Sequence, residues 1–70
     1  MAEDFPVVGK VGEVITRIRG GESPGEVCVT VRGVREQLIA YADEVIEPQT
    51  AVLIFRFRGA RAVDVMPWGL

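Results

Sequence analysis

The fold is decided by the stretch Glu26-Val27-Cys28-Val29-Thr30-Val31-Arg32. Its three valines alternate with less apolar residues, which is the pattern of a β-strand with one buried face and one more open face. Gly33 follows, and a second alternating segment, residues 35–41, places Leu38 and Ala40 on one face. The pattern predicts a β-hairpin with its turn at residues 32–34.

The segments on either side of this hairpin predict one more strand and two connections. Residues 7–19 are rich in β-branched side chains, and their alternation changes phase near Val14 and Ile15, which indicates a bulge or a sharp bend. Residues 20–25 (GGESPG) are typical of a loop. For residues 42–50 a short helical turn is an alternative, but we favour an irregular connection.

The last part of the chain predicts a second hairpin, with Gly59 at its turn. Residues 51–58 form its first strand, with Val52 and Ile54 on one side and Leu53, Phe55 and Phe57 on the other. Phe55 and Phe57 are expected to fill the core. Residues 62–67 form its second strand. There the alternating side chains are Val63 and Val65 on one face, and Asp64 and Met66 on the other.

The composition agrees with this series of short strands. Val, Ile and Thr together supply 20 of the 70 residues, and such β-branched side chains suit pleated strands. Eight glycines and four prolines separate the segments. Five strands with glycines where the first one bends predict an all-β fold, a small closed or nearly closed five-stranded β-barrel.

The charge and the absent residue types narrow the function. The chain has a net charge of −2 and is 49% apolar, which is typical of one small globular domain and not of a disordered chain. It contains no His, one Cys and one Lys, so Ser–His and Cys–His nucleophile pairs and thiolate-rich zinc sites are excluded. A metal site made only of carboxylates, or an acid/base pair of carboxylates, is still compatible with the composition. We nevertheless expect no catalytic residues, no metal and no cofactor, and we predict that the domain is not an enzyme.

A series of short motifs gives the sequence a family resemblance. In order they are Gly9-Lys10-Val11-Gly12, Pro24-Gly25-Glu26-Val27, Gly33, Ala40, Pro48-Gln49-Thr50-Ala51-Val52, Gly59 and Val63-Asp64-Val65-Met66-Pro67. This order resembles the C-terminal soluble domain of NfeD-like membrane proteins, over about residues 8–68. The resemblance implies a bacterial five-stranded OB-fold barrel, attached to transmembrane helices that would precede residue 1.

The same resemblance implies a function. NfeD-like proteins are often encoded beside stomatin-like or flotillin-like membrane-scaffold proteins. The implied role is a non-catalytic interaction module that contacts such partners from the cytoplasmic side of the plasma membrane. The family commonly has a Pro and a Gly before the fourth strand, where this chain has Glu47 and Gln49. A Gln adopts a positive φ at higher cost than a Gly does.

The expected domain limits follow from the same pattern. Residues 1–7 are expected to be a flexible lead-in, residues 8–68 the β-barrel domain, and residues 69–70 a tail. The lead-in lacks a basic segment followed by an apolar one, so it is not a signal peptide.

An acidic stretch, a glycine-rich loop and the single cysteine could each indicate a functional site, but we favour a purely structural explanation for all three. Asp43, Glu44 and Glu47 are the most acidic stretch, and we favour a solvated loop over a metal or acid/base site because nothing there would shift a pKa. The glycine-rich loop at residues 20–25 lacks the Gly-Lys-Ser/Thr and the helix of a phosphate-binding loop. Cys28 is expected to be a passive, half-buried thiol.

The arginines suggest a candidate interaction surface. Residues 51–70 carry a charge of +2 and residues 1–50 carry −4. A basic patch would meet lipid head groups, an acidic partner or single-stranded nucleic acid; the other explanation is surface charge paired with Glu13, Glu36 or Asp64. After Pro67, the apolar end of the chain could cap the barrel, pack on another subunit of a homo-oligomer or meet a membrane surface. The candidate residues are Arg17, Arg19, Arg56, Arg58, Arg61 and Trp68.

Binding of single-stranded nucleic acid through this patch is the alternative function. Such surfaces combine clustered positive charge with exposed aromatic side chains. The chain is acidic overall and has five aromatic residues, so we regard nucleic acid as the less favoured partner.

Overall fold

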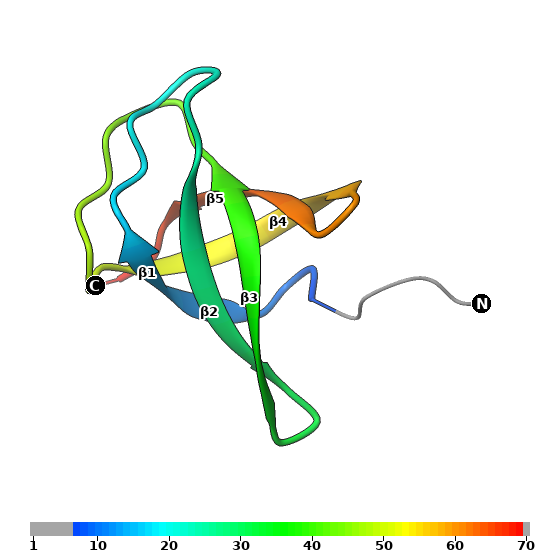
Figure 1. The fold of residues 1–70 in the computed structure, drawn as a ribbon. Helices are drawn as coiled ribbons and strands as arrows, with labels where there is room; N and C mark the ends of the chain where they lie inside the picture. The colour runs from blue at the N-terminus through cyan, green and yellow to red at the C-terminus, as the bar shows by residue number, and fades with distance from the viewer. Residues whose placement is uncertain (1–6, 70) are drawn as a thin grey trace.

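The computed structural model describes residues 7–69, in which five strands form a closed barrel (Figure 1). The strands are β1 (Val11–Thr16), β2 (Gly25–Val31), β3 (Val34–Tyr41), β4 (Ala51–Gly59) and β5 (Ala62–Pro67). Their order around the barrel is β1-β2-β3-β5-β4, and β4 pairs again with β1. Only β3 and β5 pair in parallel. The predicted all-β, five-stranded small barrel is confirmed.

The β2–β3 hairpin follows the alternation of its sequence. The three valines of β2 are buried, and Val31 faces Val34 in the register. The turn therefore consists of Arg32 and Gly33, with φ angles of 55° and 82°. Positive φ at both positions is the geometry that fits the twist of a two-residue hairpin. The predicted turn is confirmed.

β1 closes the barrel because it pairs with two strands. Residues 11–13 face β4 and residues 13–16 face β2. The register with β2 shifts between Val14 and Thr16, so the predicted irregularity is confirmed. β1 is shorter at both ends than the predicted strand at residues 7–19, and between Thr16 and Gly20 the pairing is reduced to one isolated bridge, from Ile18 to Ile46.

Residues 42–50 form the irregular connection that we favoured between β3 and β4. Ile46 is buried there and exchanges backbone hydrogen bonds of 2.9 and 3.0 Å with Ile18. Gln49 has a φ of 73°, and its N–H donates to the carbonyl of Val14 at 2.7 Å. The position where the resemblance implies Gly therefore has a left-handed backbone, which Gln adopts at higher cost.

The barrel interior is one cluster of mostly β-branched side chains. Its buried members are Val7, Val14, Ile18, Val27, Val29, Val31, Leu38, Ala40, Ala42, Ile46, Val52, Ile54, Val63 and Val65. Phe57 packs against this cluster. Phe55 is 49% exposed, so its predicted core position is wrong. The register of β4 shifts between Ile54 and Arg56, and the extra residue in that bulge changes which side chains point inward.

The two ends of the domain are described only in part. Val7, the last residue of the expected lead-in, is fully buried. The rest of the lead-in, residues 1–6, and Leu70 of the expected tail lie outside the described residues. Residues 7–69 include no helix with the length and apolar character needed to cross a bilayer.

Candidate functional site

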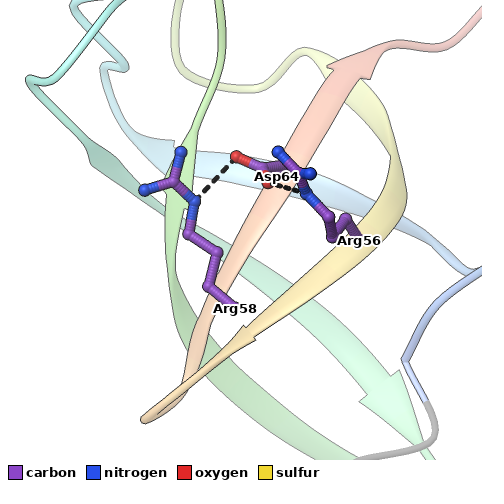
Figure 2. Close-up of polar contacts among 3 residues, drawn as sticks. All are labelled: Arg56, Arg58 and Asp64. Atoms are coloured by element: carbon purple, nitrogen blue, oxygen red, sulfur yellow. Dashed lines mark hydrogen bonds and ion pairs between the residues drawn. The ribbon is translucent and has the colours of Figure 1, made fainter.

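Two bulges in β4 bring two arginines to one carboxylate on β5. The pairing shifts between Ile54 and Arg56, and again between Phe57 and Gly59. Over this stretch β4 runs from residue 54 to residue 59, while β5 runs only from residue 65 to residue 62. The outward side chains of β4 are therefore crowded around Asp64, which Arg56 and Arg58 approach from opposite sides (Figure 2).

Asp64 is buried, with 6% of its surface exposed, and both of its carboxylate oxygens are bound. The Nε of Arg56 donates to Oδ2 at 2.7 Å, and the Nε of Arg58 donates to Oδ1 at 2.9 Å. The guanidinium of Arg58 also lies over the ring of Tyr41, 3.9 Å from its centroid, which is a cation–π contact. We call Asp64, Arg56 and Arg58 the Asp64 cluster.

The environment of Asp64 keeps it ionised. Burial raises its pKa because the charged form loses hydration, but the hydrogen bonds and positive charges of Arg56 and Arg58 outweigh this effect. The pKa of Asp64 therefore lies below its ordinary value of 3.8. With one negative and two positive charges, the cluster carries one excess positive charge at neutral pH.

The remaining candidate arginines lie in other ion pairs. Arg61 donates to Glu36 and to the carbonyl of Gln37, both at 2.9 Å. Arg17 pairs with Glu47 at 3.4 Å, and both of these side chains are more than half exposed, so the pair contributes little to stability. The structure thus brings Arg56 and Arg58 together, whereas Arg17 and Arg61 each bind a different carboxylate.

Of the three predicted carboxylate partners, two are found. Glu36 and Asp64 bind arginines, whereas Glu13 makes no ion pair within residues 7–69. Arg19 has no ion-pair partner in the same range.

Beside the Asp64 cluster, three adjacent strands expose apolar side chains. Val11 of β1 faces Leu53 of β4, and Leu53 faces Met66 of β5; residues directly opposite one another lie on the same face of a sheet. Val11 and Met66 are exposed, as are Phe55 and Trp68. Trp68, the sixth candidate residue, lies two positions beyond Met66. We call Val11, Leu53, Phe55, Met66 and Trp68 the apolar face.

A groove connects the apolar face with the Asp64 cluster. It has a volume of about 420 Å³, and Phe55, Met66 and the whole Asp64 cluster line it. Val65 and Pro67 of β5, Gly21 and the segment at residues 41–44 complete its lining. That segment includes the exposed carboxylates of Asp43 and Glu44, so the groove contains charges of both signs.

The outer side of β1, β2 and β3 holds a second groove, of about 770 Å³. Its lining includes the half-buried Cys28 together with Ile15 and Arg35. Asp43, Glu44 and Glu47 are exposed. No group of His, Cys, Asp and Glu residues within residues 7–69 is arranged to hold a metal ion.

Sequence reasoning missed the apolar face and the burial of Asp64. One signal for the face was available: the alternation puts Leu53 on the side opposite Val52 and Ile54, so burial of these two residues would leave Leu53 on the outer side. Asp64 is flanked by Val63 and Val65. These neighbours do not predict that two arginines of another strand cover its carboxylate.

The sequence profile of the NfeD C-terminal domain matches residues 11–66. The chain belongs to this family. The NfeD-like resemblance deduced from the motifs is thereby confirmed. No curated protein sequence matches the chain.

The solved structures include a protein similar to this NfeD domain. It is the solution structure of the soluble domain of the NfeD protein YuaF from Bacillus subtilis. The TM-score is 0.72 and the sequence identity is 26%, over 84% of this chain and 70% of the YuaF chain. The closed barrel of this NfeD domain is therefore the fold of the YuaF soluble domain.

Proposed function

We propose that this NfeD C-terminal domain is a non-catalytic module that binds a membrane-scaffold protein of the stomatin or flotillin type through its apolar face. The observation that carries the proposal is the apolar face itself, which is contiguous across β1, β4 and β5. Contiguous exposed apolar surfaces rimmed by polar residues mark interaction sites in soluble domains, and aromatic residues and Met are enriched in protein–protein interfaces.

The proposal includes the location of the domain. In the full-length protein, transmembrane segments outside this chain hold the domain at the cytoplasmic face of the plasma membrane. A scaffold protein attached to the same membrane then meets the domain at a high local concentration, so a small apolar contact is sufficient for binding.

The state of Asp64 supports a non-catalytic role. Both of its oxygens accept hydrogen bonds from arginines, and its pKa lies below the ordinary value. A carboxylate in this state is a poor proton acceptor at neutral pH. The chain also contains no histidine.

The nucleic-acid alternative gains no support from the arginines. Its candidate arginines do not form one patch: Arg56 and Arg58 share Asp64, whereas Arg17 and Arg61 each pair with a different carboxylate. A titration with single-stranded oligonucleotides at low salt tests it, since an electrostatic site must bind there and weaken as salt rises.

The proposal is tested by affinity purification of the full-length protein from native membranes. We expect wild type to recover a stomatin-like or flotillin-like protein, identified by mass spectrometry. The double variant Phe55→Ser/Met66→Ser is expected to recover about tenfold less of this partner than wild type does, because a few exposed apolar side chains supply most of the binding energy in such contacts.

Val34→Ser is the matched control, because Val34 is equally exposed but lies at the β2–β3 turn. It should recover the partner as wild type does. The proposal fails if wild type recovers no scaffold protein from a preparation that retains known membrane complexes.

A further inference from the structure

We propose that Arg56 is the specificity-determining residue of the apolar face, where its guanidinium binds a single carboxylate on an apolar segment of the partner protein. This inference rests on the proposed function, because it assigns the chemistry of the segment that the apolar face binds. It is carried by the geometry of the Asp64 cluster and by the groove that connects it with the apolar face.

The first step is the fixed orientation of Arg56. Its side chain is 67% exposed, yet its Nε is held at 2.7 Å from Oδ2 of the buried Asp64. No hydrogen bond within residues 7–69 uses its two terminal nitrogens. An exposed arginine normally loses much side-chain entropy on binding. Because Asp64 already orients Arg56, a ligand at the terminal nitrogens meets a preorganised donor pair.

The second step distinguishes Arg56 from Arg58. Arg58 is bound on two sides, by Asp64 and by the ring of Tyr41, and it is less exposed than Arg56. One carboxylate cannot neutralise two guanidinium groups, so the cluster retains one positive charge. A single carboxylate from outside would complete this neutralisation at Arg56, the more accessible of the two arginines.

The third step concerns what lies next to Arg56. Phe55 and Met66 line the same groove as Arg56, so a carboxylate bound there would have apolar neighbours. An arginine beside exposed apolar side chains is a frequent centre of binding energy in protein interfaces. The partner segment therefore carries one Asp or Glu next to apolar residues.

The charges at the other side of the groove exclude a polyanion. Asp43 and Glu44 line it as well, and they would repel a ligand with several negative charges. A nucleic acid or a highly phosphorylated segment is therefore disfavoured. The excess positive charge belongs to the Asp64 cluster alone, because with Asp43 and Glu44 the charged groups that line the groove sum to −1. The site therefore admits one carboxylate, placed at Arg56 itself.

The test uses random dodecapeptides selected by phage display against the 70-residue chain. We expect the selected peptides to carry one Asp or Glu beside apolar residues. Fluorescence anisotropy then gives the Kd of two selected peptides for wild type, for Arg56→Gln and for the control Arg35→Gln. Arg35 is an exposed arginine on β3 with no ion pair within residues 7–69.

Arg56→Gln is expected to raise the Kd about tenfold, and Arg35→Gln to leave it within about twofold. Replacing the peptide carboxylate by its amide should raise the Kd for wild type by about tenfold as well. The same peptide change should have no further effect on Arg56→Gln, because the two groups would then be direct partners. The peptide change on wild type tests the contact even if Arg56→Gln is unstable.

Three outcomes would overturn the inference: no peptide is selected, the selected peptides lack a carboxylate, or the two changes are additive. These outcomes differ from the failure of the proposed function. If Arg56→Gln recovers the scaffold partner as well as wild type does, the inference about Arg56 is wrong, but the proposed role of the apolar face is unaffected. Peptide binding that depends on Arg56, with no scaffold protein recovered from membranes, removes the proposed partner class instead.

Discussion

Asp64 shows how one buried charge can organise a surface. It lies on β5 between two apolar core residues, but its carboxylate faces outward and both of its oxygens are used by arginines of β4. A buried charge is costly unless it is paired and hydrogen-bonded. The burial of Asp64 is thus possible only because Arg56 and Arg58 cover it, and in turn it fixes the directions of both.

We expect Asp64→Asn to lower the free energy of unfolding at neutral pH by about 1–3 kcal/mol, because charge-assisted hydrogen bonds are lost. The folded pKa lies below the ordinary value of 3.8, so this stabilisation is complete well above pH 3.8 and is lost as the pH falls through the folded pKa. The difference between wild type and variant should therefore close in acid, as measured by urea unfolding over a pH series.

Asp43→Asn is the matched control for this titration, since Asp43 is exposed. It should differ little from wild type at any pH. Curves for wild type and Asp64→Asn that stay parallel down to the most acidic samples would contradict the argument.

Gln49 is a residue with an unfavourable backbone conformation. Its φ of 73° lies in the left-handed region, where a Cβ is disfavoured. We expect Gln49→Gly to raise the free energy of unfolding by about 0.5–1 kcal/mol, and the Tm by roughly 4–8 °C per kcal/mol. Gln49→Ala keeps the Cβ and should leave the Tm nearly unchanged. An equal rise in both variants would show that the side chain, and not φ, limits stability.

At the scale of the elements, the close approach of two chain segments fixes where β2 begins. A Cβ on Gly25 would overlap the carbonyl oxygens of Thr16 and Arg17. β1 and β2 therefore converge at a point where only glycine fits. The loop at residues 20–25 has to end there, and the register between Glu26 and Thr16 follows.

Gly25→Ala is expected to lower the free energy of unfolding by about 2 kcal/mol or more, because the backbone must shift to admit the methyl group. Gly69→Ala is the control, since a Cβ there meets no atom within 4 Å. It should change stability by less than about 0.5 kcal/mol. Thermal or urea unfolding of both variants checks the prediction, and a stable Gly25→Ala variant would argue against the convergence of β1 and β2 at this point.

The elements also show what could be predicted from the sequence. The β2–β3 hairpin was predictable because strict alternation and Arg32-Gly33 specify it locally. The inward side chains of β4 were not, because its bulges depend on how it pairs with β5. Phe55 was assigned to the core for that reason, whereas the buried side of β4 is that of Val52 and Ile54.

At the scale of the whole molecule, the fold was more accessible to sequence reasoning than the site. Strand number and barrel closure follow from short apolar segments separated by glycines and prolines, and the family motifs agree with them. Ion pairs depend on which strands become neighbours. Arg61 and Glu36 are 25 residues apart in sequence, so the sequence alone left several partners open. Four of the five candidate arginines are distributed over three carboxylates, which is closer to paired surface charge than to one basic patch.

The pairing between β3 and β5 is short, and this affects how the barrel meets other copies of the chain. Only Ile39–Tyr41 of β3 faces β5, so within the described part of the chain the preceding residues of β3 have an open edge. Such an edge is a template for aggregation with another copy. Arg61 binds the carbonyl of Gln37 and the carboxylate of Glu36 at the start of that edge. It thereby occupies an acceptor that an intruding strand would need, and it protects the barrel from edge-to-edge association.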